Sequence, residues 1–83
     1  MSSKEKILQK ILSGSRNVRF GDMLTLVNAF GFRLSRTKGS HHIFTRIGVY
    51  ELVNLQNVHG QAKPYQIKQF LNLVERYNLK MED

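Results

Sequence analysis

The stretch from residue 32 to residue 55 limits the fold of this chain more than any other. Residues 32–38 begin with alternating apolar and polar side chains, and two further short segments follow, at 41–47 and 49–55. Gly39 lies in the first link between them and Gly48 forms the second. Short segments joined by such links are typical of antiparallel hairpins. The stretch therefore predicts a meander of three antiparallel strands.

A short helix is predicted at residues 2–13. Ser2 and Glu5 fit a capping box, and Gly14 suits the position at which the helix ends. The apolar residues of this segment share one face: Ile7, Leu8, Ile11 and Leu12. Because a helix this short is marginally stable alone, we expect that face to dock on the rest of the domain, with a partner protein as the alternative.

Two further amphipathic helices are predicted, one before and one after the strands in the sequence. The first covers residues 20–29 and is followed by Gly31, which suits the left-handed position after a helix. The second begins at Pro64, whose missing amide is tolerated at the first helical position. The polar residues 56–63 are interpreted as a loop and residues 81–83 as a tail. The expected fold class is α+β, with helices covering one face of a three-stranded antiparallel sheet.

Length and composition narrow the classes of protein. A chain of 83 residues has room for one small core, so residues 1–83 are expected to form a single domain. The absence of cysteine excludes disulfides and thiolate chemistry. No apolar run approaches the roughly 20 residues of a membrane span, and no secretory signal is evident. We therefore expect a cytoplasmic protein that does not bind a membrane.

Positive charge is concentrated in the first half of the chain. The net charge is +7, and eight bases against two acids give residues 1–40 a net of +6. An acidic partner is expected, either a nucleic acid or an acidic protein, although a generally basic surface without a specific partner explains the charge equally well.

Residues 39–44, Gly-Ser-His-His-Ile-Phe, place two histidines side by side. Four cationic residues surround them in the sequence, with no acidic residue between the outermost two: Arg33, Arg36, Lys38 and Arg46. Cations bind phosphate, and an imidazole, with an unperturbed pKa of about 6.5, can move a proton beside it. His41 and His42 are therefore the candidate catalytic residues, the alternative being surface histidines without a role. They should face opposite sides of a strand, and periodicity does not decide which one faces the helices.

Three further residues are candidates for contacts to RNA. Lys63 and Lys68 accompany the first turn of the last helix, where free amides favour a phosphate or a carboxylate. Lys68 on a merely solvated face is the alternative. Ser40 has no partners for covalent catalysis, and its position in the turn after Gly39 explains it adequately.

An ordered set of motifs resembles the HicA toxin family of prokaryotic toxin-antitoxin pairs. The motifs are Gly31-Phe32, Gly39-Ser40-His41 and Lys63-Pro64. The match covers about residues 19–79 and leaves residues 2–13 as an additional helix. It implies an α-β-β-β-α fold like the double-stranded-RNA-binding domain, and a metal-independent endoribonuclease without cofactor that acts on mRNA. It also implies a HicB-type antitoxin as partner. The family's functional histidine maps onto His41, with His42 as the neighbouring candidate.

The chain departs from that family in one motif. Members commonly carry Pro-x-His after the third strand, whereas Leu55-Gln56-Asn57 occupies these positions here and His59 follows two residues later. A second functional histidine is therefore not carried over.

In a metal-independent ribonuclease the 2′-hydroxyl of RNA is the nucleophile. If His41 removes its proton, a cation from Arg36, Lys38 or Arg46 would stabilise the charge on phosphorus.

Two other functions use the same residues. A non-catalytic RNA- or DNA-binding module would need the cations and not the proton transfer, and a basic adaptor for an acidic protein would not bind RNA at low salt. Metal binding is less well supported, because neighbouring strand residues such as His41 and His42 diverge, and His59 with scattered carboxylates gives no standard zinc spacing.

Overall fold

The computed structural model describes residues 3–14 and 16–82, in which three helices and four strands form an α+β fold. The helices are α1 (Ser3–Leu12), α2 (Phe20–Ala29) and α3 (Pro64–Arg76). The strands lie between α2 and α3: β1 (Arg33–Lys38), β2 (His41–Arg46), β3 (Val49–Val58) and β4 (Gln61–Ala62). The α+β class agrees with the sequence prediction, and so does the order of the elements apart from β4, which lies where a loop was predicted. The predicted capping residue Ser2 lies outside the described residues.

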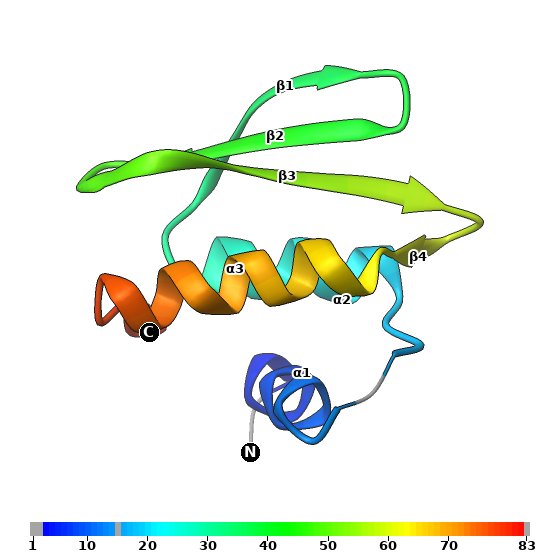
Figure 1. Cartoon of the computed structure of the whole chain (residues 1–83), viewed down its shortest axis with the longest axis horizontal. Coiled ribbons are helices and arrows are strands. Elements are labelled where there is room, and N and C mark those ends of the chain that lie inside the picture. The colour runs from blue at the N-terminus through cyan, green and yellow to red at the C-terminus, as the bar shows by residue number, and fades with distance from the viewer. Residues whose placement is uncertain (1–2, 15, 83) are drawn as a thin grey trace.

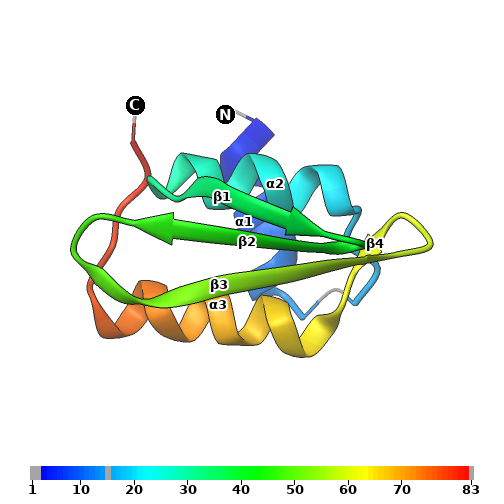
Figure 2. The same cartoon turned by 90° about the horizontal axis from the view of Figure 1, so that it is seen from above.

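These elements form three layers (Figure 1). The sheet is the first layer, α2 and α3 lie side by side beneath it, and α1 lies on the far side of those two helices. The view from above shows the strands crossing over α2 and α3 (Figure 2). No helix among the described residues covers the other face of the sheet, which we call the open face. The prediction that the helices cover one face is confirmed.

The sheet is antiparallel with the strand order β1-β2-β3-β4, so the predicted meander is present but the count of three strands is wrong. β3 continues to Val58, and the predicted loop contains a tight hairpin to β4. His59 and Gly60 make its two-residue turn with φ of 52° and 82°, the left-handed values that a type I′ turn requires. This hairpin contacts the segment before α2, because the amide of Phe20 donates to the carbonyl oxygen of Gly60 at 2.9 Å.

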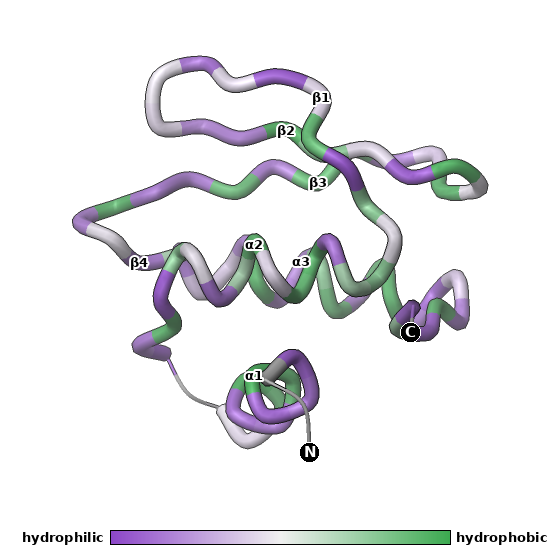
Figure 3. The backbone as a smooth tube through the Cα atoms, turned by 180° about the vertical axis from the view of Figure 1, so that it is seen from behind, coloured by the Kyte–Doolittle hydropathy of each residue, from purple (hydrophilic) through white to green (hydrophobic). Residues whose placement is uncertain are grey.

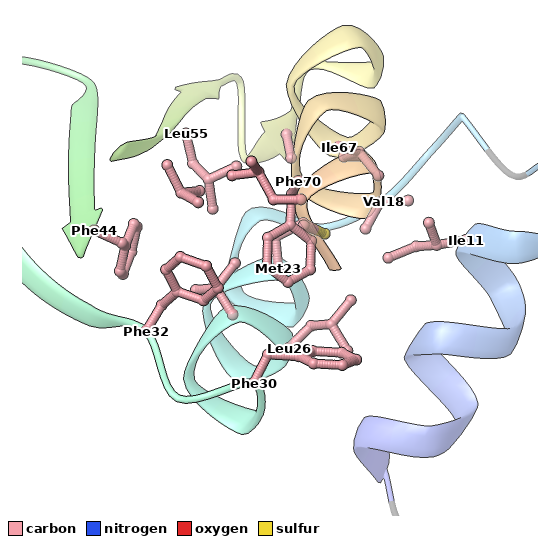
Figure 4. Packing of buried hydrophobic residues seen from close by; sticks show 14 of the residues in the cluster. Ile11, Val18, Met23, Leu26, Phe30, Phe32, Phe44, Leu55, Ile67 and Phe70 are labelled. Atoms are coloured by element: carbon pink, nitrogen blue, oxygen red, sulfur yellow. The ribbon is translucent and has the colours of Figure 1, made fainter. Parts of the chain in front are cut away.

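The core lies between the sheet and the two central helices (Figure 4). Its largest fully buried side chains come from α2, α3, β2, β3 and the residue before β1: Phe32, Phe44, Phe70, Met23, Leu26 and Leu55. Burial of one such side chain contributes about 1.5–3 kcal/mol, so this layer holds the strands against the helices. α1 docks on the same core through Ile11, as predicted, but Leu12 stays 66% exposed.

Both central helices end in the same capping arrangement. Gly31 follows α2 with a φ of 89°, and the amide of Phe32 donates to the carbonyl oxygen of Val27 at 3.0 Å. Asn78 follows α3 with a φ of 51°, and the amide of Leu79 donates back to α3 in the same way. The predicted role of Gly31 is confirmed.

The predicted tail at residues 81–83 is wrong for the two residues that the structure describes. The amide of Glu82 donates to the carbonyl oxygen of Ala29 at 2.6 Å, and its carboxylate forms an ion pair with Arg33 at 3.0 Å. Lys4 donates to the carbonyl oxygen of Glu82, and Met81 packs against the core. These contacts hold the segment against the end of α2. Asp83 lies outside the described residues.

Within the described ranges, the search for a helix with the length and apolar character needed to cross a membrane finds none.

Candidate active site

The two adjacent histidines point to opposite faces of β2. His42 pairs with Leu55 of β3 on the side of the helices, and its ring meets the ring of Phe20 edge-on, with 4.8 Å between the centroids. His41 pairs with Gln56 and belongs to the open face. Both side chains are half-buried. The structure thus decides what periodicity left open, because His42 faces the helices and His41 faces away from them.

His41 lies in a hollow with two of the predicted cations. The hollow has a volume of about 430 Å³, and we call it the His41 hollow; its lining residues are Arg36, Thr37, Lys38, His41, Ile43 and Asn54. The strand register explains this grouping, because Lys38, His41 and Gln56 form one row across three strands and Arg36, Ile43 and Asn54 form the next. This end of the β1–β2 hairpin is mostly hydrophilic (Figure 3). None of the lining residues carries a carboxylate.

Each histidine ring has one nitrogen close to an oxygen. Nδ1 of His41 lies 3.2 Å from Oδ1 of Asn54, and Nδ1 of His42 lies 3.3 Å from the carbonyl oxygen of Ser40. The Nε2 atoms have no hydrogen-bond partner among residues 3–14 and 16–82. Since a neutral imidazole carries one donor and one acceptor nitrogen, Nε2 of His41 is the atom open to a ligand.

Ser40 belongs to the scaffold of the turn. Its hydroxyl accepts a hydrogen bond from Nε2 of Gln56 at 3.2 Å, and its carbonyl oxygen accepts from the amide of Asn57 at 3.0 Å. Gly39 beside it has a left-handed φ of 58°, which the tight link between β1 and β2 requires. These bonds fix the backbone that carries His41. A contact between Ser40 and RNA stays a prediction.

Arg33 and Arg46 lie at the other end of the hairpin and do not surround the histidines. Arg33 pairs with Thr45, whereas His41 pairs with Lys38 beside the turn. Nε of Arg46 donates to the carbonyl oxygen of Phe30 at 2.8 Å. The structure therefore brings only two of the four cations close to His41, because residues further along the two strands lie further from the turn. A contact between RNA and Arg33 or Arg46 stays a prediction. Arg33 and Arg46 line a separate hollow of about 480 Å³ that Glu82 also lines.

The two candidate lysines, Lys63 just before α3 and Lys68 within it, lie away from the open face. Lys63 has its Nζ 5.7 Å from the ring centroid of Tyr65, a cation–π distance. Lys68 lines a hollow between α1 and α3 together with Arg16, which also lines a neighbouring hollow beside Lys63. Arg16 was not a candidate from the sequence, because it lies in a turn without a motif.

A separate ionic cluster joins β3 to the end of α3. The hydroxyl of Tyr77 and the guanidinium of Arg76 both donate to the carboxylate of Glu51. The hydrogen bond from Tyr77 is the main cause that lowers the pKa of Glu51, and the same bond raises the pKa of Tyr77. Neither Glu51 nor Tyr77 lines the His41 hollow, so the cluster serves packing and not the candidate site.

Asn54 is the residue that the sequence analysis missed. It contacts His41 from the neighbouring strand, and only the register of β2 against β3 brings the two together. The alternation of β3 was a signal that Asn54 faces away from the core. The register itself depends on the link at Gly48 and on an irregularity between Phe44 and Arg46, which the pattern does not reveal.

Among the described residues, no group of three or more histidine, aspartate or glutamate side chains is placed to hold a metal ion. Comparison with models of protein families, with curated proteins and with solved structures finds no match to this chain. The geometry and the sequence motifs together are therefore what support a function.

Proposed function

We propose that the protein is a toxin of the HicA type, a cytoplasmic endoribonuclease that cleaves mRNA without a metal and is neutralised by a HicB-type antitoxin. The observation that carries the proposal is the position of His41 in a hollow of the open face beside Arg36 and Lys38. A half-buried imidazole with a free ring nitrogen beside two cations suits cleavage of a phosphodiester by acid-base chemistry.

The order of elements supports the same assignment. α2, β1, β2, β3 and α3 follow one another as in the α-β-β-β-α fold of the double-stranded-RNA-binding domain, which the HicA resemblance implies. The motifs also lie at structurally defined places: Gly31 follows α2, Ser40 comes just before β2 and His41 begins it, and Pro64 begins α3. α1 and the short β4 are additions to that pattern.

The proposed reaction is transesterification within RNA. Nε2 of His41 takes the proton of a 2′-hydroxyl, the 2′-oxygen bonds to phosphorus, and the bond from phosphorus to the 5′-oxygen breaks. Water supplies the proton to the leaving 5′-oxygen, because His42 lies on the other face of the sheet and cannot reach the same phosphate. The hydroxide that remains takes the proton from protonated His41, which restores the neutral base. Arg36 and Lys38 stabilise the charge on the phosphate oxygens. The products are a 2′,3′-cyclic phosphate and a 5′-hydroxyl.

The test is cleavage of a single-stranded RNA in EDTA by the protein and by two matched variants. We expect His41→Ala to lower the cleavage rate about 10² to 10⁴-fold, the usual contribution of a general base, while RNA binding changes little. His42→Phe, which keeps a ring against Phe20, should cleave normally. Analysis of the product ends should detect the cyclic phosphate. Loss of cleavage in EDTA, or full activity of His41→Ala, would contradict the proposal.

The alternative is a non-catalytic RNA- or DNA-binding module, and the apolar part of the open face favours it. Leu52 is 55% exposed and Tyr50 is 94% exposed on the strand that carries Asn54. Aromatic and apolar side chains beside cations are a surface on which unpaired bases stack. This module would bind RNA in the same salt-dependent manner and would leave it intact at every pH, so the cleavage assay separates the two functions.

A further inference from the structure

We propose that Asn54 is a positioning residue for the reaction, which keeps the proton of neutral His41 on Nδ1 and so leaves Nε2 as the base. This inference rests on the proposed function and adds a residue that the sequence motifs do not contain. It starts from one contact, the 3.2 Å between Oδ1 of Asn54 and Nδ1 of His41.

The chemistry of the contact fixes its direction. With Oδ1 of Asn54 facing the ring, Nδ1 is the donor and carries the proton, because an amide oxygen only accepts hydrogen bonds. In a neutral imidazole the other nitrogen then holds the lone pair. A partner that binds one ring nitrogen determines both the tautomer and the orientation of the ring, as the outer partners of metal-bound histidines do. Asn54 therefore selects the tautomer in which Nε2 accepts a proton.

The register explains how Asn54 reaches the ring. Asn54 pairs with Ile43, and His41 pairs with Gln56, so Asn54 and His41 are diagonal neighbours across β2 and β3. Side chains on the same face of adjacent strands make such diagonal contacts. Both residues lie where β2 and β3 pair without a bulge, between the turn at Gly39 and the irregularity after Phe44. The regular pairing of β2 and β3 therefore fixes the positions of both residues that make the contact.

The charge of the hollow explains why an amide suits this position. The charged groups that line the hollow with His41 are Arg36 and Lys38 of β1, while β3 contributes the neutral Asn54 and Gln56 lies beside it. A carboxylate at position 54 would add a negative charge beside the ring and the two cations. An amide orients the ring without adding charge.

The experiment combines ¹⁵N NMR of the His41 ring with pH profiles of kcat and KM, for the full chain and three variants. Asn54→Leu removes the acceptor, Asn54→Asp replaces it with a charged acceptor, and Asn72→Asp makes the same charge change at an exposed position on α3. The NMR measurement distinguishes the two neutral tautomers and does not depend on activity.

For the unchanged chain we expect the tautomer with the proton on Nδ1. Asn54→Leu should shift the ring toward the other tautomer and lower kcat about 10-fold with KM nearly unchanged, at the lower end of losses known for such outer partners. Asn54→Asp should keep the tautomer and move the acidic limb of the kcat profile to higher pH. Asn72→Asp should change neither.

Two results would overturn the inference. One is a His41 ring in the unchanged chain whose proton lies on Nε2. The other is an Asn54→Leu variant with the original tautomer and an unchanged profile. If no RNA is cleaved by any of these proteins, the proposed function fails and the positioning role fails with it, whereas normal cleavage by Asn54→Leu contradicts only the role of Asn54.

Discussion

The ring of His42 meets the ring of Phe20 edge-on, with 4.8 Å between their centroids. Phe20 is the first residue of α2, and His42 comes from the middle of the sheet, so the contact joins the two layers at one corner of the core. Nδ1 of the same ring lies 3.3 Å from the carbonyl oxygen of Ser40. One of the two neighbouring histidines is therefore part of the packing, and the other belongs to the open face.

The first prediction follows from this division of roles. His42→Ala should lower the free energy of unfolding by about 1 kcal/mol, since an aromatic pair contributes about that much beyond its buried area. His42→Phe should recover most of the loss. Urea unfolding of both variants measures this effect. A His42→Ala protein of unchanged stability that no longer cleaves RNA would show that His42 is the catalytic residue instead.

The second prediction concerns the cations of the two hollows. Arg36→Gln and Lys38→Gln should each weaken binding of single-stranded RNA and reduce its dependence on the logarithm of salt concentration by about 0.7, the value for one phosphate contact. Arg46→Gln is the matched control, because its Nε donates to the carbonyl oxygen of Phe30 at the end of α2. That variant should lose stability while the salt slope stays the same. Equal slopes for all three variants would contradict the assignment of the His41 hollow to RNA.

The third prediction concerns the turn between β3 and β4. His59 has a left-handed φ of 52°, which disfavours most side chains and suits asparagine followed by glycine. His59→Asn should keep or raise the melting temperature, whereas His59→Val should cost about 1–2 kcal/mol. Thermal unfolding measures both. Cleavage should be unchanged in His59→Asn, and a loss of activity there would assign a catalytic role to His59.

The fourth prediction is a dependence of stability on pH. The hydrogen bond from Tyr77 lowers the pKa of Glu51 below its usual 4.5 in the folded protein. A group with a lowered pKa stabilises the fold above the unfolded pKa, and this contribution is lost as the pH falls through the folded value. Tyr77→Phe should therefore reduce the loss of stability between pH 5 and pH 3, which are chosen around that value. The urea midpoints of the unchanged protein and of Tyr77→Phe at pH 5 and pH 3 measure this loss. If the midpoint falls by the same amount in both proteins, the hydrogen bond does not stabilise the fold.

The two central helices could be predicted from the sequence because the spacing of their apolar residues and the residues at their ends both indicate a helix over the same range. Gly31 follows α2 because glycine readily adopts the left-handed conformation found after a helix, and Pro64 begins α3 because a missing amide is tolerated there. The predicted range of α2 matches the structure. β4 could not be predicted in this way. Its two residues carry no alternating pattern, and the turn before it uses histidine where asparagine is usual.

The sequence could predict some of the residues of the candidate site, but it could not predict how they are arranged in space. The motif around His41 identified the residue and its nearest cations, Arg36 and Lys38. Arg46 looked equally close in sequence, yet a strand rises about 3.3 Å per residue, so five positions along β2 carry it well away from His41. Asn54 was missed for the opposite reason, because residues thirteen positions apart in sequence meet only once the register is known.

The contact between Lys4 and Glu82 brings the first and last parts of the described chain together on the side of the molecule away from the open face. A few added residues would be enough to join these parts covalently, and the exposed link at Gly48 offers a place to open the chain again. A circularly permuted protein of this design would carry its new ends at the β2–β3 link. A fluorophore attached there could then report, by a change in fluorescence, whether a polynucleotide binds to the strands.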